Sequence, residues 1–372
     1  MSPSASRCLA YLLLIVPPLV ISFYLLASFP TPPSPLSVPA YPGLASLPPE
    51  SRAREIYPEN WLEEGGYVDL PMGRTRYWLR GPKSGKKIVL IHGLSIPALV
   101  WAPLVPQLVD AGHRVLLYDL YGRGYSDAPI GAAYDAQLYV TQLALLLQHV
   151  GWQRSRIIGV SMGGAIAAAF VATFPNLVER EVVLVASAGL VESADLPRTA
   201  KVMSSPFVQA LTANPLIYAY LRRLASKPDA THEPRAALIQ ELVRHQSAHL
   251  AGFNRAVSSS LRTGPVTGMR WAFESKEWVG RRVLAIHGTA DHTVPPAHTS
   301  RIKMLIEAAG RNTSTEAPNS ERESKRTTQT KGKAWEEEER VRVARIPDAG
   351  HALTWTHADE VGKVMCQFLA GR

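Results

Sequence analysis

The segment that most restricts the fold of this chain runs from Ile157 to Ala165 and reads Ile-Ile-Gly-Val-Ser-Met-Gly-Gly-Ala. An apolar, strand-like run leads into Gly-x-Ser-x-Gly, and the small residues of a helix follow. This pattern predicts a tight strand-to-helix turn that lifts the hydroxyl of Ser161 above the edge of a sheet. Side chains at Gly159 and Gly163 would collide as the helix folds back against the strand. Ser161 is therefore the candidate nucleophile of the chain.

A serine hydroxyl is a weak nucleophile, so it needs a base, and the base needs an orienting carboxylate. Two further strand-like runs precede residues of these types. Residues 282–288 are followed by Asp291, and residues 340–346 lead to His351. The order Ser161, Asp291, His351 is the order in which hydrolases with this kind of turn carry nucleophile, acid and base. The sequence thus predicts a Ser-His-Asp triad.

Another strand-like run, residues 87–91, leads into His92 and Gly93. In enzymes with such a triad, backbone amides hold the negative charge that develops on the reacting carbonyl oxygen. One amide comes from the turn after this strand, and the other comes from the residue after the nucleophile. Here these residues are Leu94 and Met162. We interpret His92 as holding the turn rather than transferring protons.

Together these motifs resemble the alpha/beta-hydrolase superfamily. The resemblance covers residues 86–190 and 281–369, and it includes a D-x-x-G-x-G-x-S turn from Asp119 to Ser126. It implies an α/β fold with a mostly parallel central sheet, helices on both faces and a helical cap. It also implies that residues 121–126 shape a loop. The triad and amide roles above are those of the superfamily.

At the subfamily level, three features resemble membrane-anchored monoacylglycerol lipases and esterases. These are the His-Gly-Leu-Ser run, the Val-Ser-Met-Gly-Gly turn and a hydrophobic N-terminus. The C-terminal part departs from the family pattern. Many members carry Glu-x-Pro after the catalytic histidine, whereas residues 356–359 read Thr-His-Ala-Asp. This departure does not touch the triad.

Three other histidines, His287, His292 and His357, are alternatives to His351 as the base. His351 is preferred because it stands just beyond the last predicted strand. His357 is expected to lie on the helix that follows, as a surface residue.

Two other aspartates are alternatives to Asp291. Asp348 lies three residues before His351, so its side chain is expected to cap the local turn. Asp195 would serve only if the acid had moved to the end of the preceding strand. Asp291 is therefore the predicted acid.

These residues predict a serine hydrolase that cleaves a small-molecule carboxylic ester through an acyl-enzyme. The subfamily resemblance implies that the ester is lipid-like. A serine at the turn argues against haloalkane dehalogenases and epoxide hydrolases, which use a carboxylate nucleophile. Hydrolysis of a C–C bond or a peptide by the same residues remains an alternative. So does a catalytically silent binding protein with this fold.

Composition restricts the other classes of partner. The 372 residues are 46% hydrophobic and 19% charged, which is typical of a globular enzyme with a large core. The net charge of +9 favours attraction to anionic membranes. No basic run is interleaved with aromatics, so no nucleic-acid site is expected. Cys8 and Cys366 make no disulfide framework, and no spacing predicts a metal or cofactor site. The sequence leaves the oligomeric state open.

The N-terminus carries an apolar run, residues 9–29, that contains no charged residue. About 20 residues suffice for a membrane-spanning helix, so we predict a transmembrane signal anchor behind a short segment, residues 1–8. A cleaved signal peptide is the alternative. Arg7 precedes the run, and no Lys or Arg follows until Arg52. This asymmetry places the N-terminus in the cytosol and the catalytic domain in the lumen or outside the cell.

The remaining chain divides by composition. Residues 30–60 are rich in Pro and Ser, which predicts an extended stalk. Residues 61–189 and 281–372 are predicted to form the two parts of the hydrolase core. Residues 190–280 show helical periodicity, and they are predicted to form a cap over the carboxyl ends of the strands.

One insert interrupts the second part of the core. Residues 311–339 are rich in Ser, Thr, Lys and Glu, which predicts disorder. In a parallel sheet this junction lies away from the active site. Asn312 begins the N-glycosylation sequon of the chain, which would be used if this side is lumenal.

Overall fold

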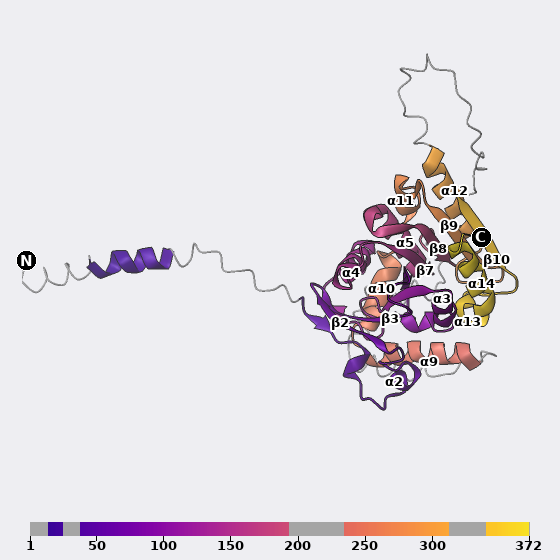
Figure 1. Cartoon of the computed structure of the whole chain (residues 1–372). Coiled ribbons are helices and arrows are strands. Elements are labelled where there is room, and N and C mark those ends of the chain that lie inside the picture. The colour runs from indigo at the N-terminus through magenta and orange to yellow at the C-terminus, as the bar shows by residue number, and fades with distance from the viewer. Residues whose placement is uncertain (1–13, 25–37, 193–233, 312–339, 372) are drawn as a thin grey trace, which may run out of the picture. The chain divides into compact units, whose positions relative to one another are not determined.

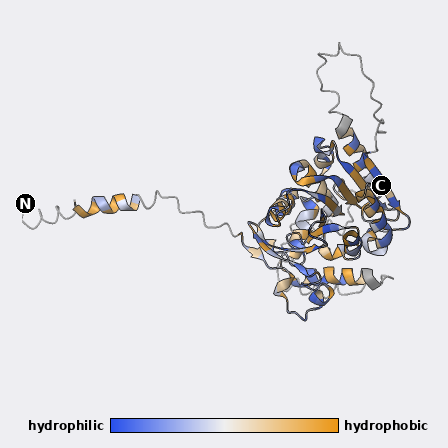
Figure 2. Cartoon of the chain, viewed as in Figure 1, coloured by the Kyte–Doolittle hydropathy of each residue, from blue (hydrophilic) through white to orange (hydrophobic). Residues whose placement is uncertain are grey.

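The computed structural model describes residues 14–24, 38–192, 234–311 and 340–371 (Figure 1). The chain divides into two units, Met1–Val38 and Pro39–Arg372, of which the second holds the catalytic candidates. In the first unit, residues 14–24 form a helix with exposed side chains that are mostly apolar (Figure 2).

The predicted anchor, residues 9–29, extends beyond this helix on both sides, into parts of the chain outside the described residues. Within the described residues, no helix combines the length and the apolar character that crossing a membrane requires.

The second unit is built on an eight-stranded sheet in the order β10-β9-β8-β7-β4-β5-β3-β2. Strand β3 runs antiparallel to both of its neighbours, and the other adjacent pairs are parallel. The predicted mostly parallel sheet is confirmed. In chain order the strands are β2 (Glu64–Leu70), β3 (Gly73–Arg80), β4 (Lys86–Ile91), β5 (His113–Tyr118), β7 (Ser155–Val160), β8 (Val178–Val185), β9 (Arg282–Gly288) and β10 (Val341–Ile346).

Helices cover both faces of the sheet, as predicted, because side chains alternate along each buried strand. Val89 and Ile91 of β4 point into one core, with α4 (Ala136–His149), α5 (Met162–Thr173) and α12 (Ala297–Arg311). Ile88 and Leu90 point into the other core, with α3 (Val105–Asp110) and α14 (Ala358–Leu369). The central strands are thus buried on both faces, which explains their continuous apolar runs.

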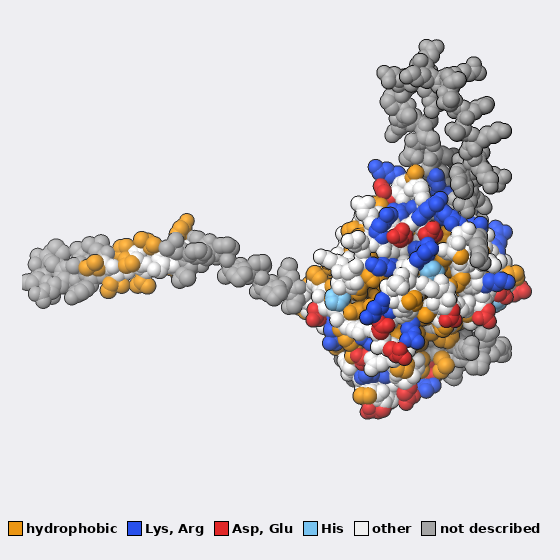
Figure 3. Space-filling model, in the orientation of Figure 1, with side chains coloured by type: hydrophobic (Ala, Val, Ile, Leu, Met, Phe, Trp, Pro, Cys, Tyr) orange, Lys and Arg blue, Asp and Glu red, His pale blue; other side chains and the backbone are white. Residues whose placement is uncertain are grey.

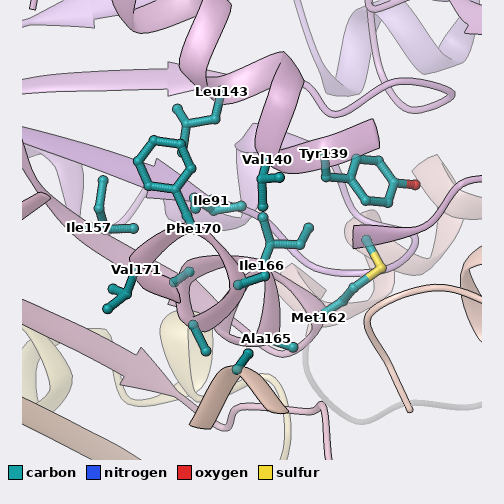
Figure 4. Close-up of a cluster of buried hydrophobic side chains, with 14 of the residues drawn as sticks. Ile91, Tyr139, Val140, Leu143, Ile157, Met162, Ala165, Ile166, Phe170 and Val171 are labelled. Carbon is teal, nitrogen blue, oxygen red and sulfur yellow. The ribbon is translucent and has the colours of Figure 1, made fainter. Parts of the chain in front are cut away.

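Helix α5, which begins directly after Ser161, is the most enclosed helix near the site (Figure 4). The alanines from Ala165 to Ala169 are fully buried and let the helix lie close to the sheet. Ile166 and Phe170 pack toward α4 (Figure 4). Burial of such a side chain contributes about 1.5–3 kcal/mol. This packing fixes the helix and, with it, the turn that carries Ser161.

Strands β4 and β7 are neighbours in the sheet, but their connections leave in opposite directions. The chain passes from β4 through α3 to β5 on one side, and from β7 through α5 to β8 on the other. Open α/β sheets bind ligands at such a divergence, outside the carboxyl ends of the strands. The turns after β4 and β7 hold Leu94 and Ser161.

The predicted cap region contains three α-helices in its described part, α9 (Pro234–His249), α10 (Phe253–Arg262) and α11 (Arg270–Phe273), and the short 3-10 helix Lys276–Trp278. Residues 193–233 lie outside the described residues. The amide of Gly124 donates to Gln246 of α9 at 2.8 Å, and Arg123 donates to the carbonyl oxygen of Ala256 of α10. Both helices therefore contact the loop at the carboxyl end of β5.

The predicted extended stalk, residues 30–60, is wrong for its described part. Residues Ala40–Tyr41 form β1, which pairs with β6 (Ala128–Pro129), and Arg52–Ile56 form α2. Leu44 and Tyr57 are fully buried in the second core. Proline tolerates the edge strand and turns used here, and the apolar residues between the prolines fill space in the core. The folded unit therefore begins at Pro39 rather than at residue 61.

The predicted insert joins the sheet away from Ser161. Helix α12 ends at Arg311, and residues 312–339, including Asn312, lie outside the described residues. The chain returns at β10, whose first residue Val341 pairs with Val283 near the start of β9. This junction is at the amino edge of the parallel strands, whereas Ser161 follows the carboxyl end of β7.

The packing of residues 39–57 predicts different stabilities for two truncated proteins. A protein lacking residues 1–37 should keep the melting temperature of the folded unit. A protein lacking residues 1–51 loses β1 and the buried Leu44, and should melt several degrees lower or fail to fold. Thermal unfolding followed by circular dichroism checks this. Leu44→Ala in the longer protein, expected to cost about 2–5 kcal/mol, is the matched control. Equal melting temperatures of the two truncated proteins would contradict the packing.

Candidate active site

Ser161 occupies a backbone conformation that non-glycine residues rarely adopt, with φ of 57° and ψ of −121°. It stands between β7 and α5. Its amide donates to the carbonyl oxygen of Val185 at 2.9 Å, while its own carbonyl oxygen accepts from the amides of Gly164 and Ala188 at 3.0 Å. Such strain persists only where surrounding structure enforces it. Here β8 and α5 enforce it, and the side chain leaves the sheet at its carboxyl edge.

Gly159 and Gly163 permit this turn, as predicted. A Cβ at Gly159 would stand 2.1 Å from the carbonyl oxygen of Gly163. A Cβ at Gly163 would stand 2.2 Å from the carbonyl oxygen of Ile91 on β4. Both obstacles are backbone atoms, which cannot rotate away. Glycine is therefore required at both positions by the close approach of α5 to β4 and β7.

The structure brings the three predicted triad residues together although they are far apart in the chain. The Nε2 atom of His351 lies 3.0 Å from Oγ of Ser161, and its Nδ1 atom lies 2.8 Å from Oδ2 of Asp291. An ionised carboxylate only accepts hydrogen bonds, so Nδ1 carries the proton. The Nε2 lone pair is then free to accept the hydroxyl proton of Ser161. His351 is partly exposed, whereas the carboxylate of Asp291 is fully buried.

The carboxylate of Asp291 is held from several sides. Its Oδ1 accepts from the amides of Thr293 and Val294 at 2.8 and 2.9 Å. Burial tends to raise the pKa of Asp291, but hydrogen bonds from His287 and His351 outweigh this and hold the pKa well below its usual value. The group therefore stays ionised at neutral pH. It is fixed in orientation and ready to stabilise an imidazolium.

His287 supports the acid of the triad, whereas the sequence predicted it only as an alternative base. Its Nε2 lies 2.9 Å from the carbonyl oxygen of Val294 and 3.2 Å from Oδ2 of Asp291. Because a carbonyl oxygen only accepts, Nε2 carries a proton that it shares between these two acceptors. Its Nδ1 lies 2.6 Å from Oγ1 of Thr299. One feature of the sequence could have indicated this role. His287 lies at the end of β9, and the short turn after that strand brings Asp291 back beside it.

The other rivals lie elsewhere. His292 is exposed, and His357 stands at the start of α14 with Nδ1 2.8 Å from Oγ1 of Thr356. Asp348 is exposed and has φ of 56°; its amide, rather than its carboxylate, bonds Oγ1 of Thr289 at 2.9 Å. The predicted side-chain cap at Asp348 is thus not what holds this turn. Asp195 lies outside the described residues.

The turn after β4 lies against the nucleophile. A Cβ at Gly93 would stand 3.3 Å from Cβ and 3.7 Å from Oγ of Ser161, where a substrate carbonyl has to fit. Within the described parts of the chain, the amides of Leu94 and Met162 donate to no protein acceptor. These two N–H groups, predicted as the oxyanion donors, are therefore available to a ligand.

His92 holds this turn by both of its ring nitrogens. Its Nδ1 donates to the carbonyl oxygen of Gly93 at 2.9 Å, and its Nε2 accepts from the amide of Leu120 at 2.8 Å. Complete burial lowers the pKa of His92 to about 3, so the ring is neutral. The carbonyl of Gly93 belongs to the same peptide group as the amide of Leu94. His92 thus fixes the plane from which that amide points, which agrees with the interpretation of His92 as structural.

Asp119 ties the loops after β4 and β5 together. Its carboxylate accepts from the amides of Ala98 and Tyr125, both at 2.8 Å, and from the hydroxyl of Tyr57 at 3.1 Å. Complete burial raises the pKa of Asp119 to about 7, and these hydrogen bonds oppose that rise. The D-x-x-G-x-G-x-S turn therefore shapes the loops around the oxyanion amides. The hydrogen bonds to the carboxylate of Asp119 come from Ala98, Tyr125 and Tyr57 rather than from Ser161.

The described surface also has a hollow of ≈ 400 Å³ lined by Pro103 and residues 355–360, none of which belongs to the predicted triad. Among the described residues, no cluster of three His, Cys, Asp or Glu side chains is suited to a metal ion.

The sequence is similar to those of known hydrolases. The profile of the family described as alpha/beta hydrolase fold matches residues 86–314. The 2-hydroxy-6-oxo-2,4-heptadienoate hydrolase of Pseudomonas putida is 27% identical over 244 residues, which cover 60% of this chain and 79% of that protein. These matches support the superfamily resemblance, and they do not point to monoacylglycerol lipases in particular.

Solved structures agree at the level of the fold. The enol-lactonase from Burkholderia xenovorans has a TM-score of 0.59 at 21% identity and covers 82% of this chain and 100% of its own. A bacterial membrane phospholipase A has a TM-score of 0.59 at 20% identity, with coverages of 83% and 86%. At such identities the likeness concerns the fold alone.

The geometry predicts how the site reacts with a fluorophosphonate probe. Wild-type protein should be labelled at Ser161, and Ser161→Ala should not be labelled. His351→Ala should react about 10²–10⁴-fold more slowly, because the general base is lost. Mass spectrometry of the labelled peptide and the labelling rate provide the readout. His292→Ala, which removes the exposed neighbouring histidine, is the matched control and should react as wild type. Labelling at another serine would overturn the assignment of the nucleophile.

Proposed function

Because this chain belongs to the alpha/beta hydrolase fold family, we propose that it is a serine hydrolase that cleaves carboxylic esters. The observation that carries this proposal is the hydrogen-bonded series Asp291–His351–Ser161 beside the amides of Leu94 and Met162, which donate to no acceptor among the described residues. A silent binding protein has no need of such a series. The retained geometry therefore favours an enzyme over a binding module.

The reaction follows from the positions of the protons. As Oγ of Ser161 attacks the ester carbonyl carbon, Nε2 of His351 takes its proton, and Asp291 stabilises the resulting imidazolium. The amides of Leu94 and Met162 hold the carbonyl oxygen while it is negative. His351 then returns the proton to the leaving alcohol, which departs and leaves an acyl-serine. Water repeats the attack with the same base and releases the carboxylic acid.

Hydrolysis of a C–C bond is the second candidate, because the Pseudomonas putida relative is named for a heptadienoate substrate. Such a substrate carries a carboxylate, and its binding calls for a free cation. The buried guanidinium near the oxyanion turn belongs to Arg123, and its N–H groups already face protein acceptors. In the described part of the chain, Arg123 is therefore not available to a substrate carboxylate, which supports esters as the substrates.

The N-terminal sequence supports a lipid-like ester and attachment to a membrane. Residues 9–29 carry no charge, and the described helix within them, residues 14–24, exposes Leu14, Leu19 and Phe23. Figure 3 shows that apolar side chains make up much of the surface of this helix. By contrast, the visible face of the second unit carries many Lys, Arg, Asp and Glu side chains (Figure 3). We propose a single-pass anchor with the catalytic unit in the lumen or outside the cell. This orientation rests on Arg7.

The choice of bond is tested with two substrate series on the protein lacking residues 1–37. Hydrolysis of p-nitrophenyl esters should be measurable, and kcat/KM should rise from acetyl toward medium acyl chains because apolar burial adds about 0.8 kcal/mol per CH₂. A 2-hydroxy-6-oxo-dienoate, followed by loss of its chromophore, should react at least a hundredfold more slowly. Ser161→Ala is the blank for both series. The opposite ranking would establish the C–C bond hydrolase instead.

Attachment is tested with the full chain. It should remain in the membrane pellet after carbonate extraction, whereas the protein lacking residues 1–37 should be released. With the proposed orientation, a glycosidase should shift the mobility of the full chain, and Asn312→Gln should remove that shift. Release of the full chain by carbonate would exclude the anchor. Cleavage between residues 312 and 339 by protease added to sealed microsomes would reverse the orientation.

A further inference from the structure

Arg123 is completely buried, yet no carboxylate among the described residues pairs with it. A buried charge without an ionic partner is costly unless hydrogen bonds satisfy it. A guanidinium has five N–H donors, and each of them has an acceptor here. Nε donates to the carbonyl oxygen of Leu94 at 2.8 Å, Nη1 donates to the carbonyl oxygen of Tyr121 at 2.9 Å and to the hydroxyl of Tyr139, and Nη2 donates to Oγ of Ser260 at 2.9 Å and to the carbonyl oxygen of Ala256 at 3.4 Å.

These acceptors belong to separate parts of the molecule. Leu94 lies in the turn after β4, while Ala256 and Ser260 lie on the cap helix α10. Tyr139 lies on α4, and its hydroxyl is also 2.8 Å from Oγ of Ser260. The guanidinium thus joins the oxyanion turn to α10 through a single planar group.

The backbone at Leu94 is held on both sides. The preceding peptide group, which contains the amide of Leu94, is fixed where His92 bonds the carbonyl oxygen of Gly93. The following peptide group is fixed where Arg123 bonds the carbonyl oxygen of Leu94. With both planes held, the direction of the Leu94 N–H has little freedom to change.

A second side chain of the cap reaches the same turn. Gln246 of α9 is fully buried, accepts from the amide of Gly124 at 2.8 Å and donates to the carbonyl oxygen of Ser95 at 3.4 Å. Gln246 of α9 thus holds the carbonyl of Ser95 directly, and α10 reaches the carbonyl of Leu94 through Arg123. This arrangement couples the position of the described cap helices to the turn beside Ser161.

We propose that Arg123 is a positioning residue for the proposed ester hydrolysis. It fixes the direction of the oxyanion amide of Leu94 and makes that direction depend on the position of cap helix α10. It touches no reacting atom and acts through the backbone of Leu94. Small displacements of this amide are expected to lower the reaction rate, because a misplacement of about 1 Å at a catalytic group can lower a rate by about 10²-fold. A lysine cannot replace this fork, because its donors all sit on one nitrogen and cannot span from Leu94 to Ser260.

The inference is tested with Arg123→Lys, Ser260→Ala and the exposed control Arg270→Lys, on the protein lacking residues 1–37. Arg123→Lys should lower kcat for a short p-nitrophenyl ester about 10–100-fold, below the loss of about 10²–10³ seen when an oxyanion donor is removed. KM should stay within about threefold. Affinity for an alkyl boronic acid, whose adduct with Ser161 mimics the oxyanion, should fall in parallel with kcat/KM. The acid limb of the pH–rate profile should not move, because His351 and Asp291 are untouched.

Ser260→Ala removes the shorter of the two hydrogen bonds from Arg123 to α10 and leaves the bond to the carbonyl oxygen of Ala256. It should lower kcat and boronate affinity a few-fold while retaining the fold. This variant keeps the test decisive if Arg123→Lys does not fold. Arg270→Lys should equal wild type. Wild-type kcat and boronate affinity in both Arg123→Lys and Ser260→Ala would overturn the positioning role and leave the proposed hydrolysis standing. If wild type hydrolyses no ester, the proposed function fails. The positioning role is then judged by the boronate affinities and by the rate of fluorophosphonate labelling at Ser161.

Discussion

The close approach of helix α5 to strands β4 and β7 is the constraint on which the site depends. It is possible only because Gly159 and Gly163 have no side chains, and it forces Ser161 into a strained backbone conformation. The strain is maintained by apolar packing on both sides of α5, with side chains such as Phe170 fully buried. Fold stability therefore maintains the exposed position of the hydroxyl, because the turn cannot relax without separating helix from sheet.

Several buried polar side chains around the oxyanion turn hold its backbone, each through a different peptide group. His92 fixes the Gly93 carbonyl, Asp119 fixes the amide of Ala98, and Arg123 fixes the Leu94 carbonyl. None of these groups lies in the hydrogen-bonded triad series, and each satisfies backbone atoms that would otherwise be buried without partners. The backbone beside Ser161 is thus preorganised by side chains from the turn after β4, from the loop after β5 and, through Gln246, from the cap. Preorganised donors need no reorganisation when charge develops on the substrate, which is the usual source of oxyanion stabilisation.

Much of the fold and the main site residues could be predicted because their signals are local. The Gly-x-Ser-x-Gly turn between a strand and a helix of small residues specifies its own geometry, and the buried strands are continuous apolar runs. Residues 39–60 show the limit of local reading. Their Pro and Ser content indicated a stalk, but Leu44 and Tyr57 are buried by residues distant in the chain. The composition of a segment indicates how stiff it is. It does not indicate whether the rest of the chain folds into a core against which the apolar side chains of that segment can pack.

The sequence by itself determined the mostly parallel sheet, the strained turn at Ser161 and the order of Ser161, Asp291 and His351, because hydrophobic periodicity and glycine placement act over a few residues. Only the tertiary structure decided the support of these groups. His287 became a partner of Asp291 because a turn brings it back beside the carboxylate. The guanidinium of Arg123 bonds both Leu94 and Ser260, which lie far apart in the sequence. Such contacts depend on how whole layers pack, and no short pattern of residues records them.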